Sequence, residues 1–151
     1  MNTQIDCHQL VAAVSDAIIV SDAEGAIVLW NAGAERVFGH TEAQALGQSL
    51  DLITPERLRQ RHWHGYHQSM VTGTTRYGAG EMLRVPAVHK DGRTLSIAFT
   101  VAMMFDAAQK VTGVIAVIRD ETARFNDDRA LRKRLAELEA SLPVAPQPVS
   151  P

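Results

Sequence analysis

The residues best suited to chemistry in this sequence lie in one run, His62-Trp63-His64-Gly65-Tyr66-His67. Imidazole nitrogens bind transition metals, and a helix would place His64 and His67, three residues apart, on one face like a pair of zinc ligands. His62 lies on a different side of that helix, and no third ligand follows nearby in the sequence. We therefore expect His64 and His67 to be a solvated pair and His62 to have a separate role.

His62 belongs to the apolar face of a predicted helix. At about 100° per residue, that face also carries Leu58, Gly65, Tyr66 and Met70. An inward histidine is either hydrogen-bonded within a core or available as a ligand at a pocket wall. The spacing predicts that His62 points into the interior, toward a sheet.

Catalytic machinery of other kinds is not recognisable. Cys7 is the one cysteine, so neither an intramolecular disulfide nor a cysteine-rich zinc site can form. Gly78-Ala79-Gly80 is an isolated GxG without the following helix of a phosphate-binding loop, and no convincing Ser/His/Asp order or paired-carboxylate motif is present. We expect the chain not to be an enzyme.

Composition restricts the possible partners. The 151 residues include 15 Lys and Arg against 17 Asp and Glu, a net charge of -2. This balance offers no basic surface to a nucleic acid or an anionic membrane. No apolar run reaches the roughly 18 residues of a membrane span, and the first six residues lack the features of a signal peptide. We expect a cytoplasmic protein.

The elements that position His62 are predicted to be strands on either side of a group of helices. Alternation and turn residues predict strands over 17–20, 26–30, 82–88, 94–104 and 111–118. The last strand is apolar on both faces, which is typical of a central strand. The order predicts an α+β fold, with helices inserted between the second and third strands of an antiparallel sheet.

Capping residues mark the helices. The predicted helices begin with a lead-in over 9–14, a short helix that ends at Gly39 and a second short helix over 42–46. A long helix up to about Val71 and a last helix after Thr122 follow. Asn31 and Thr41 are the expected N-caps of the short helices. Thr54 is the expected cap of the long helix, and Gly73 should end it.

These elements predict four segments, namely a lead-in helix in 1–15, a folded domain over 16–120, a terminal helix over 121–142, and a disordered proline-rich tail over 143–151. The terminal helix carries leucines at heptad spacing, Leu131, Leu135, Leu138 and Leu142. This row is shorter than the three to four heptads of a coiled coil. It predicts either a dimer contact or packing on the domain.

Several separated motifs resemble the PAS family of S-box type. The resemblance covers residues 8–122 in the family's order and spacing, and it rests on Asp16–Asp22, Gly25–Asn31, Ala34–Gly39, Gly47, Lys90-Asp91-Gly92 and Ile118–Thr122. It implies a five-stranded antiparallel sheet that cups a small-molecule pocket against the long helix. It also implies a sensory or interaction module whose terminal helices carry the signal.

Within the long helix, the segment from Thr54 to His62 resembles the one that carries the proximal histidine of FixL-type heme PAS oxygen sensors. The resemblance implies that His62 ligates the iron of heme b, and a neutral imidazole on an apolar wall suits such an iron. Tyr66 shares its helix face, and Arg76 lies where the family has a group that contacts a heme propionate. The facing strands would contribute Leu83, Val85, Ile97, Phe99 and Val101.

The sequence departs from the oxygen sensors at the distal position, where they hold an arginine that bonds oxygen. Counting back from Asp91-Gly92 places Leu83 there, whereas counting forward from His62 places Met82 there. Met82 as a sixth ligand would resemble the Dos-type sensors, and Leu83 would present an apolar wall. We therefore expect a sensor of oxygen, carbon monoxide, nitric oxide or redox state, with oxygen the least supported.

The alternatives are a different cofactor or none. A LOV-type photosensor needs a reactive cysteine in the helical middle of the domain, and Cys7 precedes the first strand. The two alternatives are a noncovalent flavin beside Trp30 or Trp63 and an apo PAS domain that acts by dimerisation. We expect a homodimer that signals to a separate output protein.

Overall fold

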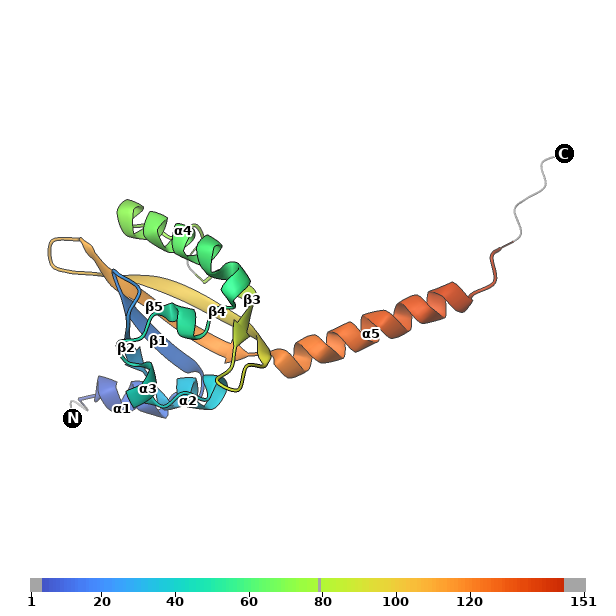
Figure 1. The fold of residues 1–151 in the computed structure, drawn as a ribbon, viewed down its shortest axis with the longest axis horizontal. Coiled ribbons are helices and arrows are strands. Elements are labelled where there is room, and N and C mark those ends of the chain that lie inside the picture. Colours follow the sequence, from blue (N-terminus) through green and yellow to red (C-terminus); the bar gives the residue numbers. More distant parts are fainter. Residues whose placement is uncertain (1–3, 79, 146–151) are drawn as a thin grey trace. The chain divides into compact units, whose positions relative to one another are not determined.

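A five-stranded antiparallel sheet forms the centre of the first of two units into which the described chain divides after Glu121 (Figure 1). The computed structural model describes residues 4–78 and 80–145. The strands are β1 (Ala17–Asp22), β2 (Ile27–Trp30), β3 (Leu83–Val88), β4 (Thr94–Phe105) and β5 (Val111–Asp120), in the spatial order β2-β1-β5-β4-β3. The predicted α+β class and the central place of the last strand are confirmed.

The helices of this unit precede β1 or lie between β2 and β3, as predicted. They are α1 (Cys7–Ala13), α2 (Ala32–Phe38), α3 (Glu42–Ala45), the 3-10 helix η1 (Leu50–Leu52) and α4 (Glu56–Thr72). Asn31 and Thr41 cap α2 and α3 with their side chains, which confirms both expected caps. The expected cap at Thr54 is wrong, because Pro55 occupies the N-cap position of α4 and makes no side-chain hydrogen bond. The Thr54 hydroxyl instead donates to the Leu50 carbonyl.

Asn31 joins α1, β1 and α2 through a side chain that is buried. Its Oδ1 accepts from the backbone N–H groups of Ile18 at 2.8 Å and Ala34 at 2.9 Å. Its Nδ2 donates to the carbonyls of Val11 at 3.0 Å and Asp16 at 3.1 Å. One capping residue therefore also fixes where α1 meets the sheet.

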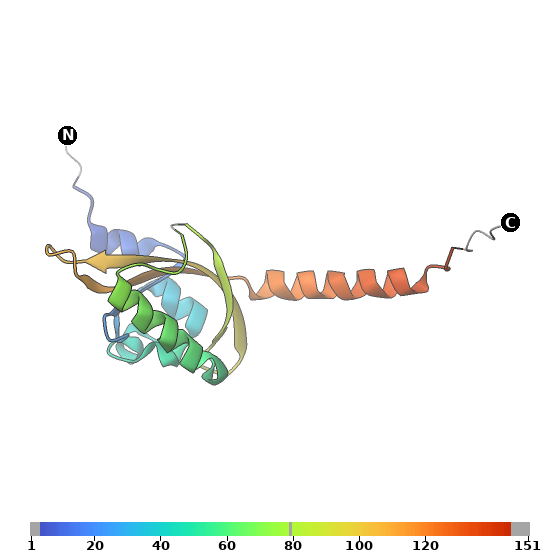
Figure 2. The same cartoon turned by 90° about the horizontal axis from the view of Figure 1, so that it is seen from above.

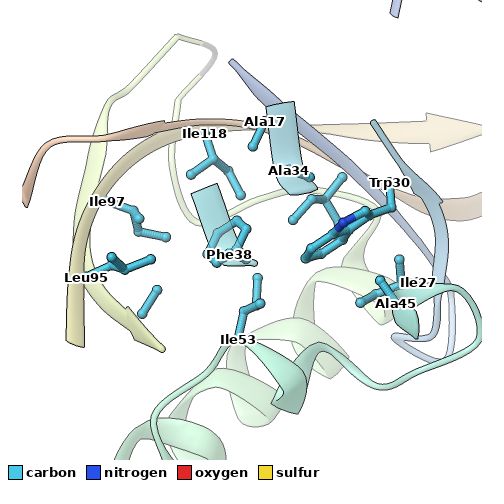
Figure 3. Packing of buried hydrophobic residues seen from close by; sticks show 12 residues of the cluster. Ala17, Ile27, Trp30, Ala34, Phe38, Ala45, Ile53, Leu95, Ile97 and Ile118 are labelled. Atoms are coloured by element: carbon cyan, nitrogen blue, oxygen red, sulfur yellow. The ribbon is translucent and has the colours of Figure 1, made fainter. Parts of the chain in front are cut away.

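The hydrophobic core lies between one face of the sheet and the helices that follow β2 (Figure 3). We call this face of the sheet the inner face. The largest fully buried side chains are Phe38, Ile19, Ile27 and Leu95. Phe99 and Ala116 pack against this core and are only partly buried. Packing is therefore dense at one part of the inner face and looser at another.

The second unit contains α5 (Thr122–Ser141). The leucines of the predicted row are all more than half exposed, at 65% for Leu131, 57% for Leu135, 54% for Leu138 and 68% for Leu142. Most of the predicted disordered tail, residues 146–151, lies outside the described residues. Among the residues described, no helix combines the length and the apolar character needed to cross a bilayer.

Candidate functional site

Tyr66 fastens α4 along the inner face of the sheet (Figures 1 and 2). Its hydroxyl accepts a hydrogen bond from Ser21 Oγ at 2.9 Å and donates to the Asp22 carbonyl at the end of β1. Burial raises the pKa of the Tyr66 hydroxyl, which keeps it a donor. Ser21 alternates along β1 with the core residue Ile19, so both side chains belong to the inner face.

Trp63 attaches α4 at a second point, about one turn before Tyr66. Its indole Nε1 donates to Asp51 Oδ1 at 2.8 Å. Its ring packs against Gly25 in the turn between β1 and β2, where an added Cβ would lie 2.2 Å from the ring. On another side, the Trp63 ring stacks on His67 with the centroids 5.9 Å apart. Trp63 is therefore held by a hydrogen bond and by contacts on two sides.

His62 lies beside these two anchored rings and is partly buried. Its ring centroid is 4.9 Å from that of Trp63, edge to face at 70°, and 6.0 Å from that of Tyr66. The His62 Nδ1 is buried and has no hydrogen-bond partner among the described residues. Burial lowers the pKa of His62, and the Asp51 carboxylate opposes this shift. His62 is thus a neutral imidazole with an unused, buried nitrogen.

The pairing of β3 with β4 decides which side chains of β3 face inward. Leu83 pairs with Phe99, and Val85 pairs with Ile97. Paired residues of neighbouring strands share a face, and Ile97 belongs to the core. Leu83 and Val85 therefore lie on the inner face, together with Phe99 and Val101.

Burial differs among these five inner-face residues. Ile97 is 5% exposed and is part of the core, whereas Leu83, Phe99 and Val101 are only partly buried. Val85 is 39% exposed. This part of the inner face is apolar and incompletely covered by the protein itself.

Met82 and Arg76 lie outside this grouping. Met82 precedes the first residue of β3 and is 49% exposed, and alternation from Leu83 directs it away from the inner face. Arg76 is exposed on the connection between α4 and β3, and Gly65 is exposed on α4.

Three residues that the sequence did not single out help to hold the site. Ser21 and Asp51 bind the two aromatic residues of α4, and Gly25 provides the space for Trp63. The spacing of Trp63 and Tyr66, three residues apart on one helix face, was the available signal. No signal in the sequence connected Asp51 to that face, because the contact depends on the course of η1.

A surface groove of about 380 Å³ lies between α4 and the turn from β1 to β2, and Glu24, Ser49, Trp63 and His67 are among its lining residues. It contains none of the residues predicted to bind heme, although Trp63 is a predicted neighbour of a noncovalent flavin. Among the described residues, no group of three His, Cys, Asp or Glu side chains is arranged to hold a metal ion.

Comparison with known proteins matches residues 6–120 to a family model described as the PAS fold. The sensor protein FixL of Bradyrhizobium diazoefficiens is 30% identical over 136 residues, which are 89% of this chain and 25% of that protein. The chain therefore spans about a quarter of that relative's length.

Two solved structures share the fold. The PAS domain of a protein from Colwellia psychrerythraea has a TM-score of 0.67 at 22% identity, covering 77% of this chain and 94% of that chain. An RNA-binding light-oxygen-voltage receptor has a TM-score of 0.66 at 20% identity, covering 90% of this chain and 40% of that chain.

Proposed function

Because this chain belongs to the PAS family of sensory domains, we propose that it binds heme b through His62 and reports a diatomic gas or the redox state of the iron. The observation that carries the proposal is the buried, unpartnered Nδ1 of a neutral His62 imidazole. A buried polar atom without a partner is costly, and an imidazole that makes no hydrogen bond to the described residues is available to a ligand. The same histidine ends the segment that resembles the FixL-type sensors.

The residues present fit a heme in three further respects. The inner face opposite α4 is apolar and partly covered at Leu83, Phe99 and Val101, as a porphyrin requires of its surroundings. Tyr66 holds α4 against β1, so the helix that bears His62 has a defined position. Arg76 would serve the propionates from the connection between α4 and β3.

A bound heme would supply an iron that takes up oxygen, carbon monoxide or nitric oxide and changes its redox state. We assign the distal position to Leu83, because its side chain lies on the inner face and Met82 would have to turn inward to ligate the iron. Leu83, Phe99 and Val101 exclude water and donate no hydrogen bond. This wall favours carbon monoxide and nitric oxide over oxygen, because bound oxygen is the ligand that a hydrogen-bond donor stabilises most.

The path from the site to α5 runs through the sheet. Tyr66 links α4 to β1, and β1 pairs with β5 along its whole length from Ala17 to Asp22. The chain then passes from β5 through Glu121 to α5. We propose that a shift of α4 changes the start of α5 in this way, and that a separate signalling protein in the cytoplasm reads the change.

Reconstitution with hemin tests the proposal. The wild-type protein should show a Soret band, His62→Ala should lose it, and His62→Gly should regain it when imidazole is added. His64→Ala is the matched control, because His64 is an exposed histidine of the same helix. A Soret band in His62→Ala identical to that of the wild type would contradict the assignment.

A second candidate is an interaction module that works by forming a homodimer. It is favoured by the exposed leucines of α5 and by exposed apolar residues of β4 and β5, with Met104 39%, Phe105 48% and Val117 38% exposed. Colourless protein after expression with heme supplementation would favour this function, whereas flavin absorption would indicate the alternative cofactor. A monomer by light scattering at micromolar concentration would count against it.

A further inference from the structure

The orientation of His62 has an unusual origin in this chain. A histidine that ligates a metal through one ring nitrogen commonly has its ring fixed by a hydrogen bond from the other nitrogen. The His62 Nδ1 has no such partner among the described residues. Some other contact must hold the side chain in its rotamer.

Trp63 makes that contact. Its indole ring meets the His62 imidazole edge to face, with the centroids 4.9 Å apart and the planes at 70°. This is a favoured geometry for aromatic pairs, because the positive edge of one ring approaches the negative face of the other. Tyr66 lies farther from His62, at 6.0 Å, and edge to face with Trp63 at 5.4 Å.

The Trp63 ring is itself immobilised by residues from two other segments and by one residue of its own helix. Asp51 of η1 accepts its Nε1–H at 2.8 Å, Gly25 of the β1–β2 turn lies against the ring, and His67 stacks on it. An adjacent residue that is anchored in this way can restrict the rotamer of its neighbour. A tryptophan that rotated freely could not restrict its neighbour in this way.

We propose that Trp63 is a positioning residue that holds the His62 side chain in one rotamer, and that Asp51 acts through Trp63 by holding the indole in place. The link to cofactor binding rests on the proposed function, whereas the restriction of the His62 ring is a property of the protein without cofactor. The orientation is thus set by ring packing and not by a hydrogen bond to Nδ1.

The test measures His62 in two independent ways. Scalar couplings that report χ1 of His62 are recorded by NMR on the protein without cofactor, and hemin affinity is measured by titration. Trp63→Leu should average the χ1 couplings and weaken hemin binding about 10- to 100-fold, the range found for outer residues of metal sites. Trp63→Phe keeps a ring beside His62 and should retain most of both signals.

Two further variants separate the causes. Asp51→Ala removes the acceptor of the Trp63 Nε1–H and should partly average the couplings, whereas Asp51→Asn keeps an acceptor and removes the charge, so it should not. His64→Ala is the matched control, since His64 is an exposed histidine of the same helix. If Trp63→Leu fails to fold, the Asp51 pair decides the question.

The outcomes are distinguishable. Averaged couplings in Trp63→Leu or Asp51→Ala support the positioning role even if the wild type binds no hemin, in which case only the proposed function fails. Unchanged couplings in a folded Trp63→Leu overturn the inference, even if the wild type binds hemin through His62. If Trp63→Leu is unfolded, unchanged couplings in Asp51→Ala have the same consequence.

Discussion

The Tyr66 hydroxyl of α4 and the Ser21 hydroxyl of β1 lie 2.9 Å apart, although 45 residues separate them in the sequence. The same Tyr66 hydroxyl donates to the Asp22 carbonyl. These bonds attach the long helix to a strand next to the centre of the sheet. The helix that bears His62 is therefore held in position by contacts within the protein.

Tyr66→Phe should lower the free energy of unfolding by about 1–2 kcal/mol, because it leaves a buried serine hydroxyl without its partner. Urea denaturation measures the change. Tyr77→Phe is the control, since Tyr77 is 36% exposed and should tolerate the loss of its hydroxyl. Equal effects of the two variants would show that the bond to Ser21 contributes nothing.

Gly25→Ala should destabilise the protein more than Gly92→Ala. Both glycines have positive φ, 85° at Gly25 and 89° at Gly92, so both substitutions carry a backbone cost of about 1 kcal/mol. A Cβ at Gly92 meets open space, whereas one at Gly25 collides with the Trp63 ring. We expect overpacking to add about 1–3 kcal/mol at Gly25, together with a change in Trp63 fluorescence. Indistinguishable denaturation midpoints would argue against tight packing there.

Much of the fold follows from the sequence because its signals are local. The caps at Asn31 and Thr41 and the apolar faces of β5 depend on neighbours close in sequence, and these predictions are confirmed. The prediction that Thr54 caps α4 was wrong because the Thr54 hydroxyl can bond either to the start of α4 or to the preceding segment. Folding of η1 brings the Leu50 carbonyl within reach, and the hydroxyl donates to it.

The site was less predictable because it depends on register. The two ways of counting to the distal position differed by one residue, and that difference reverses the face of every side chain of β3. The sequence alone does not show where the connection from α4 ends and β3 begins, so Met82 and Leu83 were both candidates for the distal position. The pairing of Leu83 with Phe99 settles which of the two lies on the inner face.

Stability should decrease as the pH falls below about 6.5. Burial lowers the pKa of His62 from 6.5, and burial followed by the nearby charges of Lys90 and His89 lowers that of His40. The unfolded chain then binds more protons than the folded one, so the stabilisation is complete above pH 6.5 and is lost as pH falls toward the folded pKa values.

Urea denaturation of the protein without cofactor between pH 5 and 8 measures this dependence. His40→Gln should flatten the curve, because it removes one of the two shifted groups. The same dependence in His40→Gln and the wild type would show that His40 is equally basic in both states.

Replacing Leu135 and Leu138 by Asp should abolish self-association while hemin binding is kept. Both leucines are more than half exposed, and a charge in an apolar dimer contact is strongly unfavourable. Ala136→Asp with Ala140→Asp adds the same charge on the opposite side of α5 and is the control. Analytical ultracentrifugation distinguishes the two. Loss of association in both variants would show that charge alone, and not the leucine row, is responsible.

The sheet joins the two ends of the first unit, since β1 pairs with β5 and Arg119 forms an ion pair with Asp16 across 103 residues of sequence. During synthesis, β1 emerges from the ribosome long before its partner exists. Until β5 is made, β1 has an unpaired edge, and the nascent chain must avoid premature strand pairing with other chains. Closure of the sheet is therefore a late event with a high loop-closure cost. A polypeptide that stops before β5 would lack the centre of its sheet, not merely its last strand.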